Sequence, residues 1–375
     1  MTNPFKFGNI VYGDYFYNRE EELLRINRVL SDGNNITLYA PRRYGKTSLV
    51  KKALGELENE GFKTVYIDFM KIYSREKFIE NYTSEIVNKN SSSIDNIITK
   101  VAKFVSGIVP SVSFDNNGNP KFSLAYVQGQ NTETTLIDAI NLPEKLASDN
   151  QKWIIAFDEF QEITNLNGDS FEKILRSEIQ HQKNVSYIFF GSKTHLLKDM
   201  FNNKNRAFYN SSMIMTINKI KEGKSIDFLV ERFHNSEVSL TDDIAKYILQ
   251  KVENIPYYIQ FIAYEIWQFM IVNNKKTITK DLVNDAFDRI LEIKNDYYWE
   301  LTNKQTNYRK KVLKALASSS KEIFSHKVSQ KFSLGATSST QKAIDVFIND
   351  GIIEKSEANY EFSDPIFKEF IISKM

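Results

Sequence analysis

Residues 40–48 read Ala-Pro-Arg-Arg-Tyr-Gly-Lys-Thr-Ser and have the residue types and the spacing of a phosphate-binding loop. They match the pattern G-x-x-x-x-G-K-[ST] at every fixed position except the first, where Ala40 replaces glycine. In such a loop, backbone N–H groups point toward an anion at the start of a helix, and Gly45 lets the backbone approach a β-phosphate. We therefore expect Lys46 to contact the β- and γ-phosphate oxygens of a nucleotide and the Thr47 hydroxyl to bind Mg²⁺.

The other residues of this segment are assigned less specifically. The arginines at positions 42 and 43 contact a nucleotide, a partner subunit or only solvent, and the sequence leaves these possibilities open. For the whole segment, the alternative is a basic turn that only caps a helix. The further residues of the segment that we expect to contact the nucleotide are Pro41, Arg42, Arg43, Tyr44 and Ser48.

A second segment supplies two carboxylates, since the apolar run 154–157 ends in Asp158 and Glu159. This is the Walker B pattern, in which Asp158 holds Mg²⁺ and Glu159 orients or activates the attacking water. The alternative is that the two carboxylates simply begin a polar loop. For Gln161 and Glu162, which follow, we favour that simpler interpretation and expect a solvated loop.

Two further polar residues are candidates for contact with phosphate. Ser192 follows the next apolar strand, where a polar side chain in additional-strand ATPases senses the γ-phosphate; the alternative is that Ser192 caps a helix. Arg206 precedes the last expected strand and reaches a phosphate in cis or in trans, or is an ordinary surface arginine. We count both among the candidate catalytic residues.

The elements that position these residues alternate between short apolar strands and amphipathic helices through the first half of the chain. This order predicts an α/β fold of the P-loop NTPase type with a doubly wound parallel sheet. Residues 90–135 interrupt the order with turn signals, and we interpret them as an insertion, either a surface hairpin of 112–114 against 122–125 or a mobile loop. The strands are expected at 36–40, 64–68, 152–157, 185–190 and 213–217.

The second half of the chain predicts two smaller domains. Four helical patterns between 225 and 293 indicate a helical lid, with Thr279 as the N-cap of the fourth. The order helix, helix, helix, hairpin that follows is typical of a winged helix-turn-helix, with Ser325 as an N-cap in its second helix. We expect a core at 1–220, a lid at 221–300 and a winged helix at 301–375.

Basic charge is concentrated in the first helices of the expected winged helix. Residues 301–342 contain nine lysines and arginines but a single carboxylate, Glu322. One interpretation is that this domain contacts DNA; the other is a regulatory domain that packs on the ATPase core. The candidate DNA-contacting residues, at the start of the expected recognition helix, are Ser338, Ser339, Gln341 and Lys342.

The composition excludes several classes of protein. The chain has 375 residues with 49 Lys and Arg against 47 Asp and Glu, so a uniformly basic nucleic-acid coat is excluded. No cysteine is present, which excludes disulfides, zinc–thiolate sites and thiol nucleophiles, and the four histidines have no metal-binding spacing. The sequence has neither a long apolar run nor the pattern of a signal peptide, so we expect a soluble cytoplasmic protein with no membrane partner.

Several of these segments together carry a family resemblance. Residues 16–24, Phe-Tyr-Asn-Arg-Glu-Glu-Glu-Leu-Leu, are similar to the box F-x-x-R-E-x-E-L. With that box, the chain resembles the archaeal-type ATPase family, in the STAND branch of the AAA+ P-loop NTPases, over essentially its whole length. The other segments that carry the resemblance are 40–48, 157–161, 191–193, 206–209 and 254–258.

The resemblance implies an ATPase core, a helical lid and a winged helix. It also implies that the N-terminal box lines the adenine site, through Tyr17, Asn18 and Arg19. STAND proteins have Gly-x-Pro near the lid, and this chain has Asn254-Ile-Pro256 instead. Only Pro256 is therefore carried over, as a lid contact with the nucleotide.

Our first hypothesis is a molecular switch that binds ATP or ADP with Mg²⁺ and hydrolyses ATP slowly or when a partner stimulates it. The switch acts by binding double-stranded DNA, by binding a protein partner or by forming a homo-oligomer in the ATP state. The alternative is a DNA-binding ATPase resembling archaeal origin-recognition initiators, against which no sensor arginine is evident in the lid helices. A P-loop kinase of a small molecule is the least favoured hypothesis, because it has no obvious use for a lid and a winged helix.

Overall fold

The computed structural model describes residues 2–89, 101, 103–114, 120–129, 131–148, 151–166, 169–356 and 359–375. The chain forms two compact units that alternate along the sequence. One comprises Arg19–Ala40 and Lys46–Ile217; the other comprises Met1–Asn18, Pro41–Gly45 and Asn218–Met375. Residues 41–45 of the expected phosphate-binding loop thus belong to the second unit, whereas Ala40 and the helix that begins at Lys46 belong to the first.

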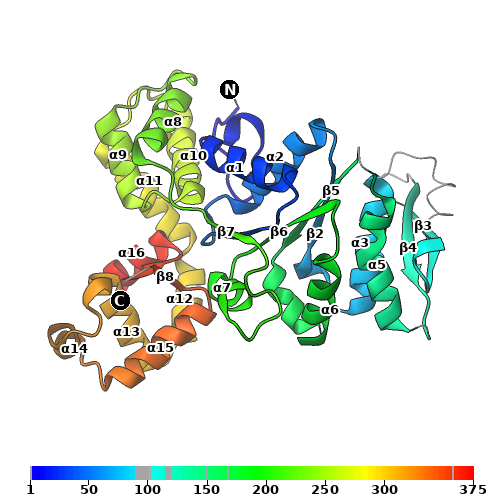
Figure 1. Cartoon of the computed structure of the whole chain (residues 1–375). Coiled ribbons are helices and arrows are strands. Elements are labelled where there is room, and N and C mark those ends of the chain that lie inside the picture. The colour runs from blue at the N-terminus through cyan, green and yellow to red at the C-terminus, as the bar shows by residue number, and fades with distance from the viewer. Residues whose placement is uncertain are drawn as a thin grey trace. The chain divides into compact units, whose positions relative to one another are not determined.

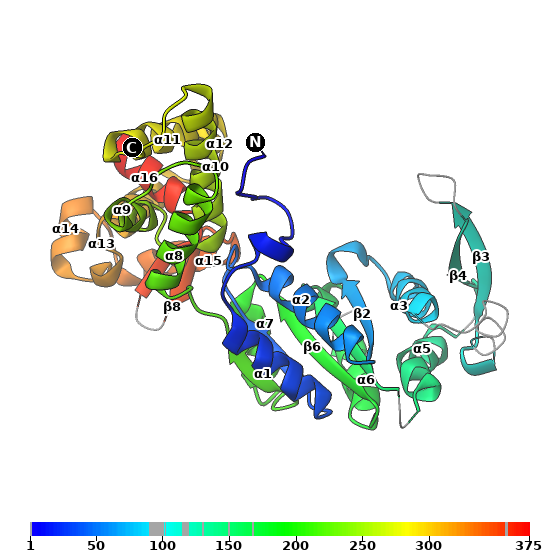
Figure 2. The same ribbon diagram turned by 90° about the horizontal axis from the view of Figure 1, so that it is seen from above.

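The first unit is built on a five-stranded sheet in the order β2-β5-β6-β1-β7, with every neighbouring pair parallel. Helices α1 and α2 lie on one face and α6 and α7 on the other (Figures 1 and 2), which confirms the expected doubly wound α/β fold. The strands are β1 Ile36–Tyr39, β2 Lys63–Asp68, β5 Trp153–Asp158, β6 Val185–Gly191 and β7 Met213–Thr216. The helices are α1 Glu20–Ser31, α2 Lys46–Asn59, α3 Arg75–Lys89, α5 Thr132–Leu146, α6 Asp169–Ile179 and α7 Thr194–Asn202.

The register of the sheet brings the ends of four strands to the same edge. Asp68 of β2 pairs with Asp158 of β5, and Tyr39 of β1 pairs with Gly191 of β6. Every residue of β1, β5 and β6 is buried, as expected for strands covered on both faces. The core beside these strands contains an aromatic cluster whose rings stack, tilt or meet edge to face. Its members include Phe69, Phe78, Phe157, Phe160, Phe171 and Phe189.

The insertion contains the expected hairpin. Strand β3, Ile108–Phe114, pairs antiparallel with β4, Pro120–Tyr126, and Val112 is opposite Phe122. Backbone N–H groups of Leu124 and Tyr126 donate to side chains of α3, which fix the hairpin beside that helix (Figure 1). The hairpin interpretation is thus confirmed, whereas residues 90–100 and 115–119 of the insertion lie outside the described residues.

The second unit contains the helical domain and the winged helix. Thr279 and Ser325 accept backbone N–H bonds as the N-caps of α11 and α14, as expected. The helical domain consists of α8 Glu222–His234, α9 Asp242–Lys251, α10 Pro256–Val272, α11 Lys280–Ile293 and α12 Asn295–Asn303. The winged helix consists of α13 Asn307–Ser319, α14 His326–Phe332, α15 Thr337–Asn349, β8 Ile353–Ser356, β9 Asn359–Phe362 and α16 Pro365–Lys374.

No helix in the described part of the chain combines the length and the apolarity that crossing a bilayer requires. The expected boundaries at 220 and 300 stay predictions, since the two units do not divide the chain at single points.

Candidate functional site

The start of α2 places Lys46 at the end of the neighbouring strand β6. Helix α2 begins at Lys46 because the apolar residues Leu49, Ala53 and Leu57 recur at helical spacing and are buried. The Lys46 ammonium, only 7% exposed, donates to the backbone carbonyl oxygen of Gly191. A buried ammonium therefore lies at the edge of the sheet, next to the carboxylates of β5.

Asp158 is the centre of a hydrogen-bond network at the end of β5. Its Oδ2 accepts from the Thr47 hydroxyl at 3.2 Å and from the phenol of Tyr66, and its Oδ1 accepts from the Glu159 N–H at 2.8 Å. Burial raises the pKa of Asp158, although the bond from Tyr66 and the charge of Lys46 act in the opposite direction. The two expected metal ligands, Thr47 and Asp158, are thus adjacent.

This donor set fits Mg²⁺. A hydroxyl and a carboxylate are hard oxygen ligands, and Mg²⁺ is usually bound by one or two protein groups together with water and substrate phosphates. Within the described residues, no group of three or more His, Cys, Asp or Glu side chains forms a metal cage. Thr47 and Asp158 are therefore suited to a magnesium ion that arrives with a nucleotide, rather than to a permanently held one.

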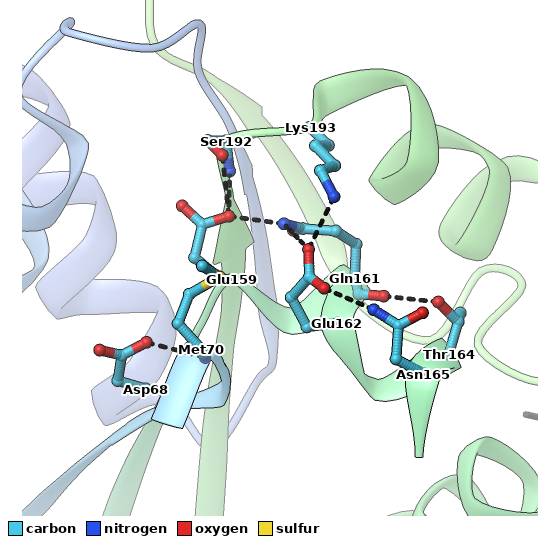
Figure 3. Close-up of polar contacts among 9 residues, drawn as sticks. All are labelled: Asp68, Met70, Glu159, Gln161, Glu162, Thr164, Asn165, Ser192 and Lys193. Carbon is cyan, nitrogen blue, oxygen red and sulfur yellow. Dashed lines mark hydrogen bonds and ion pairs between the residues drawn. The ribbon is translucent and has the colours of Figure 1, made fainter. Parts of the chain in front are cut away.

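Glu159 is held by the strand end next to it. Its backbone lies in the left-handed region at φ 49°, and its Oε2 accepts from the Ser192 N–H and hydroxyl, both at 2.9 Å, and from Gln161 Nε2 at 2.5 Å (Figure 3). Burial alone would raise the pKa of Glu159, but Lys46 and these donors outweigh it and the pKa is lowered. Glu159 is therefore an ionised, restrained carboxylate.

The solvated loop expected for Gln161 and Glu162 is wrong, and one of the two interpretations left open for Ser192, the helix cap, is excluded. Gln161 is not in a solvated loop: it is 1% exposed within the short helix Phe160–Asn165 and bonds to Glu159. Glu162 accepts from Lys193 at 2.9 Å. Ser192 does not cap α7 either, because the N-cap position is Lys193 and the Ser192 hydroxyl is bonded to Glu159 (Figure 3).

Tyr66 is a site residue that the sequence motifs do not indicate. It lies on β2, where it pairs in register with Ala156, two residues before Asp158. The ammonium of Lys51 lies 3.9 Å from the centre of its ring, and its hydroxyl reaches Asp158. The only available signal is the strand register, which requires the order of the sheet to be known.

Arg206 is engaged by two carboxylates. Its guanidinium bonds to Glu172 of α6, which is 3% exposed, and to Asp199 of α7 at 3.1 Å. The arrangement indicates a structural ion pair.

The N-terminal box is split between the two units. Tyr17, in the second unit, stacks on Phe228 of α8 with ring centres 3.8 Å apart. Asn18 has a φ of 55°, and Arg19, at the start of the first unit, bonds to Glu22 at 2.8 Å. Their expected contacts with adenine stay predictions.

In the lid segment, Asn254 stands where the Gly-x-Pro pattern has glycine. Asn254 has a φ of 54°, a left-handed conformation that glycine adopts freely and asparagine tolerates. Its amide donates to the Ile220 carbonyl at 2.7 Å, and Pro256 is the first residue of α10. A contact of Pro256 with a nucleotide stays a prediction.

The candidate DNA-contacting residues lie at the start of α15. Ser338, Ser339 and Lys342 are exposed, and Gln341 is partly exposed and donates to Asp345 at 2.8 Å. The helix therefore presents hydroxyl groups and an ammonium to solvent.

The comparison with protein families decides the assignment. A model described as an ATPase domain predominantly from Archaea matches residues 16–262, which is well over half of the chain. The chain belongs to this family. A second model, a probable winged helix domain, matches residues 296–373 of this archaeal-type ATPase.

Two relatives of this archaeal-type ATPase are uncharacterized ATP-binding proteins of Methanocaldococcus jannaschii. One is 34% identical over 124 residues, which are 30% of this chain and 33% of that protein, so the match spans about a third of the relative's length. The other is 25% identical over 338 residues, which are 75% of this chain and 84% of that protein.

Three solved structures resemble this archaeal-type ATPase in fold. The Walker-type ATPase PABY2304 of Pyrococcus abyssi has a TM-score of 0.67 at 16% identity, covering 98% of this chain and 99% of that one. The ORC2 protein of Aeropyrum pernix, in ADPNP and ADP complexes, has a TM-score of 0.59 at 12% identity over 99% of each chain. The ORC1 protein of the same organism, in complex with DNA, has a TM-score of 0.51 at 14% identity over 96% and 94%.

Proposed function

We propose that this archaeal-type ATPase binds ATP and ADP with Mg²⁺, and that it hydrolyses ATP slowly as a STAND-type molecular switch. The observation that carries the proposal is the single network at the carboxyl edge of the sheet. It links Lys46 and Thr47 of α2, Asp158 at the end of β5, Glu159 directly after that strand and Ser192 after β6. The ATP-binding relatives and the nucleotide complexes of the similar ORC2 protein support the same ligand.

Each residue of the network has a distinct role in the proposal. Lys46 donates to Gly191 through a buried ammonium, which is available to β- and γ-phosphate oxygens when they replace that carbonyl. Thr47 and Asp158 hold Mg²⁺, which neutralises phosphate charge when it is bound. Glu159 orients the attacking water, and Ser192 contacts the γ-phosphate.

The contacts of Glu159 support the proposal that turnover is slow. Its Oε2 accepts three hydrogen bonds, two from Ser192 and one from Gln161, so this oxygen has little capacity left for a water molecule. Activation of water by Oε2 therefore requires Glu159 to give up at least one of these donors. A γ-phosphate that engages the Ser192 hydroxyl would release the carboxylate in the same step.

The test is steady-state ATP hydrolysis together with nucleotide binding for two variants. Lys46→Ala should lose nucleotide binding, whereas Glu159→Gln should bind ATP normally but hydrolyse it at least a hundredfold more slowly. Lys52→Ala, on the exposed side of the same helix, is the control and should resemble the wild type. Turnover at wild-type rates in both Lys46→Ala and Glu159→Gln would eliminate the proposal.

The switch itself is tested by light scattering with ADP and with a non-hydrolysable ATP analogue. We expect the ATP analogue, but not ADP, to favour an open or oligomeric state, or binding to a protein partner. If the mass and the hydrodynamic radius are identical with both nucleotides, the proposed self-assembly is wrong, and only the proposed ATPase activity remains.

A second candidate function is DNA binding, favoured by the exposed Ser338, Ser339 and Lys342 on a helix within the basic segment. The similar ORC1 protein was solved in complex with DNA. Duplex binding by fluorescence anisotropy should weaken steeply as salt rises. Lys342→Glu should weaken binding to all sequences, while Lys275→Glu, in the helical domain, should not. No binding at low salt would remove this candidate.

A further inference from the structure

The loop 41–45 is bonded to acidic residues of the winged helix, and both belong to one compact unit. The Arg43 guanidinium lies 3.2 Å from Asp364 Oδ2 and donates to the Ser363 carbonyl at 3.4 Å. The Arg42 N–H donates to Glu354 Oε1 of β8 at 3.1 Å. Two carboxylates of the winged helix thus bind donors of a loop whose sequence is that of a phosphate site.

Asp364 is built into the winged helix by several other contacts. It is the N-cap of α16, where its Oδ1 accepts from the N–H groups of Ile366 and Phe367. Its Oδ2 also accepts from the Tyr298 hydroxyl at 3.0 Å and lies 3.7 Å from the Lys294 ammonium. The carboxylate is 13% exposed, so solvent screens these charges only in part. Asp364 therefore keeps a cation and a donor even when Arg43 leaves it.

Arg43 is held in an uncommon conformation by the same unit. Its φ is 70°, in the left-handed region, and its carbonyl accepts from the Tyr257 N–H at 3.3 Å. Its guanidinium lies 4.8 Å from the ring centre of Tyr258 and 5.2 Å from that of Tyr257. Close packing also depends on Gly351, because a Cβ there would lie 3.2 Å from Arg42 Nη1. The loop is thus shaped by the helical domain and the winged helix.

Arg43 has two competing anions. A guanidinium binds phosphate oxygens at least as well as a carboxylate, and a nucleotide at this loop carries several negative charges against the single charge of Asp364. Lys294 and Arg43 also repel one another at the shared carboxylate, which lowers the cost of separating them. Departure of Arg43 would leave Asp364 paired, so both arrangements are accessible.

We propose that Arg43 is exchanged between Asp364 and the nucleotide phosphates, so that nucleotide binding at the loop weakens the attachment of the winged helix. This inference rests on the proposed function, because it requires a nucleotide at the loop. Coupling between two sites is reciprocal, so a weaker attachment of the winged helix must raise nucleotide affinity by the same factor.

The test measures ADP affinity by calorimetry and amide hydrogen exchange at 351–375, on the full chain. Asp364→Asn keeps an N-cap acceptor but removes the charge that binds Arg43. We expect it to bind ADP about five- to tenfold more tightly and to exchange faster at 351–375 without nucleotide. Glu361→Gln is the control: it lies on β9 and pairs with Lys219 at 3.3 Å, so it should resemble the wild type.

Arg43→Gln is a second variant that breaks the same ion pair from the loop side. Because it leaves the N-cap of α16 unchanged, it distinguishes loss of the ion pair from a folding defect in α16. It should exchange like Asp364→Asn without nucleotide, and ADP should no longer increase exchange at 351–375. If Asp364→Asn and Arg43→Gln both exchange like the wild type while ADP binds normally, the coupling is overturned and the proposed function stands. If no form of the protein binds ADP, the proposed function fails and the coupling fails with it.

Discussion

Replacing Gly191 with alanine tests whether Gln161 and Glu159 hold one another in place. A Cβ at Gly191 would lie 1.9 Å from Gln161 Oε1, 3.0 Å from Gln161 Cδ and 3.2 Å from the Cα of Glu159. The first distance is far shorter than any real contact of a Cβ atom, so the Gln161 side chain must move.

The size of the effect follows from the burial of Gln161. Its side chain is 1% exposed, so its amide cannot turn into solvent without displacing neighbours. Moving it breaks the 2.5 Å bond to Glu159, and a hydrogen bond to a charged group contributes about 1.5–3 kcal/mol. Overpacking adds about 1–3 kcal/mol. We expect Gly191→Ala to lower the free energy of unfolding of the first unit by about 2.5–6 kcal/mol.

The assay is urea denaturation followed by the fluorescence of Trp153, the tryptophan of the first unit. Trp267 and Trp299 belong to the second unit and are replaced by phenylalanine in the test background. With a slope of about 2 kcal/mol per molar urea, the expected change lowers the midpoint by about 1–3 M.

Two controls make this prediction refutable. Gly55→Ala, within α2 and with no heavy atom within 4 Å of the added Cβ, should stabilise the unit by about 0.5–1 kcal/mol. In a Gln161→Ala background, Gly191→Ala should cost less than about 1 kcal/mol. If Gly191→Ala behaves like Gly55→Ala, or costs the same with and without Gln161, the buried contact does not hold Glu159.

Three further substitutions have defined outcomes. Tyr66→Phe removes a donor to Asp158 and should weaken Mg²⁺-dependent ATP binding about tenfold without changing binding in EDTA, as measured by calorimetry; equal loss in both conditions would contradict a role at the metal. Arg206→Ala strands the buried Glu172 carboxylate and should lower the free energy of unfolding by about 3 kcal/mol in urea; a fall in turnover at unchanged stability would instead indicate a catalytic role. Asn131→Ala removes the N-cap of α5 and should cost about 1 kcal/mol in the same assay; no change would show that the cap is dispensable.

The features that the sequence predicts correctly are those set by residues close together in the chain. Each of these features depends on a short segment of sequence. They are the hairpin in which Val112 faces Phe122, the N-caps Thr279 and Ser325, and the adjacent carboxylates of Asp158 and Glu159. In these cases local propensity and turn chemistry agree with the tertiary fold, so a pattern is sufficient.

The residues that the sequence analysis did not assign to the site depend on contacts between distant segments of the chain. Tyr66 reaches Asp158 only because β2 and β5 are neighbours in register. Gln161 looks like a loop residue in the sequence, and its burial follows from the absence of a side chain at Gly191. Asp364 is recognisable as an N-cap before Pro365, but its ion pair with Arg43 spans most of the chain.

Both departures from the family pattern have a local physical reason. Ala40 is completely buried where β1 ends, so a small side chain takes the place of glycine at the first loop position. Asn254 has a left-handed φ of 54°, a conformation that glycine adopts freely and asparagine tolerates. Neither substitution argues against a nucleotide site.

Calorimetric titration of ADP into the wild-type protein and into Lys46→Ala, both in Mg²⁺, tests the central claim most directly. We expect one ADP per chain for the wild type and none for Lys46→Ala, because the buried ammonium at the start of α2 is the main cationic group for the phosphates. Absence of heat with the folded wild-type protein, or equal affinity in the two proteins, would contradict it.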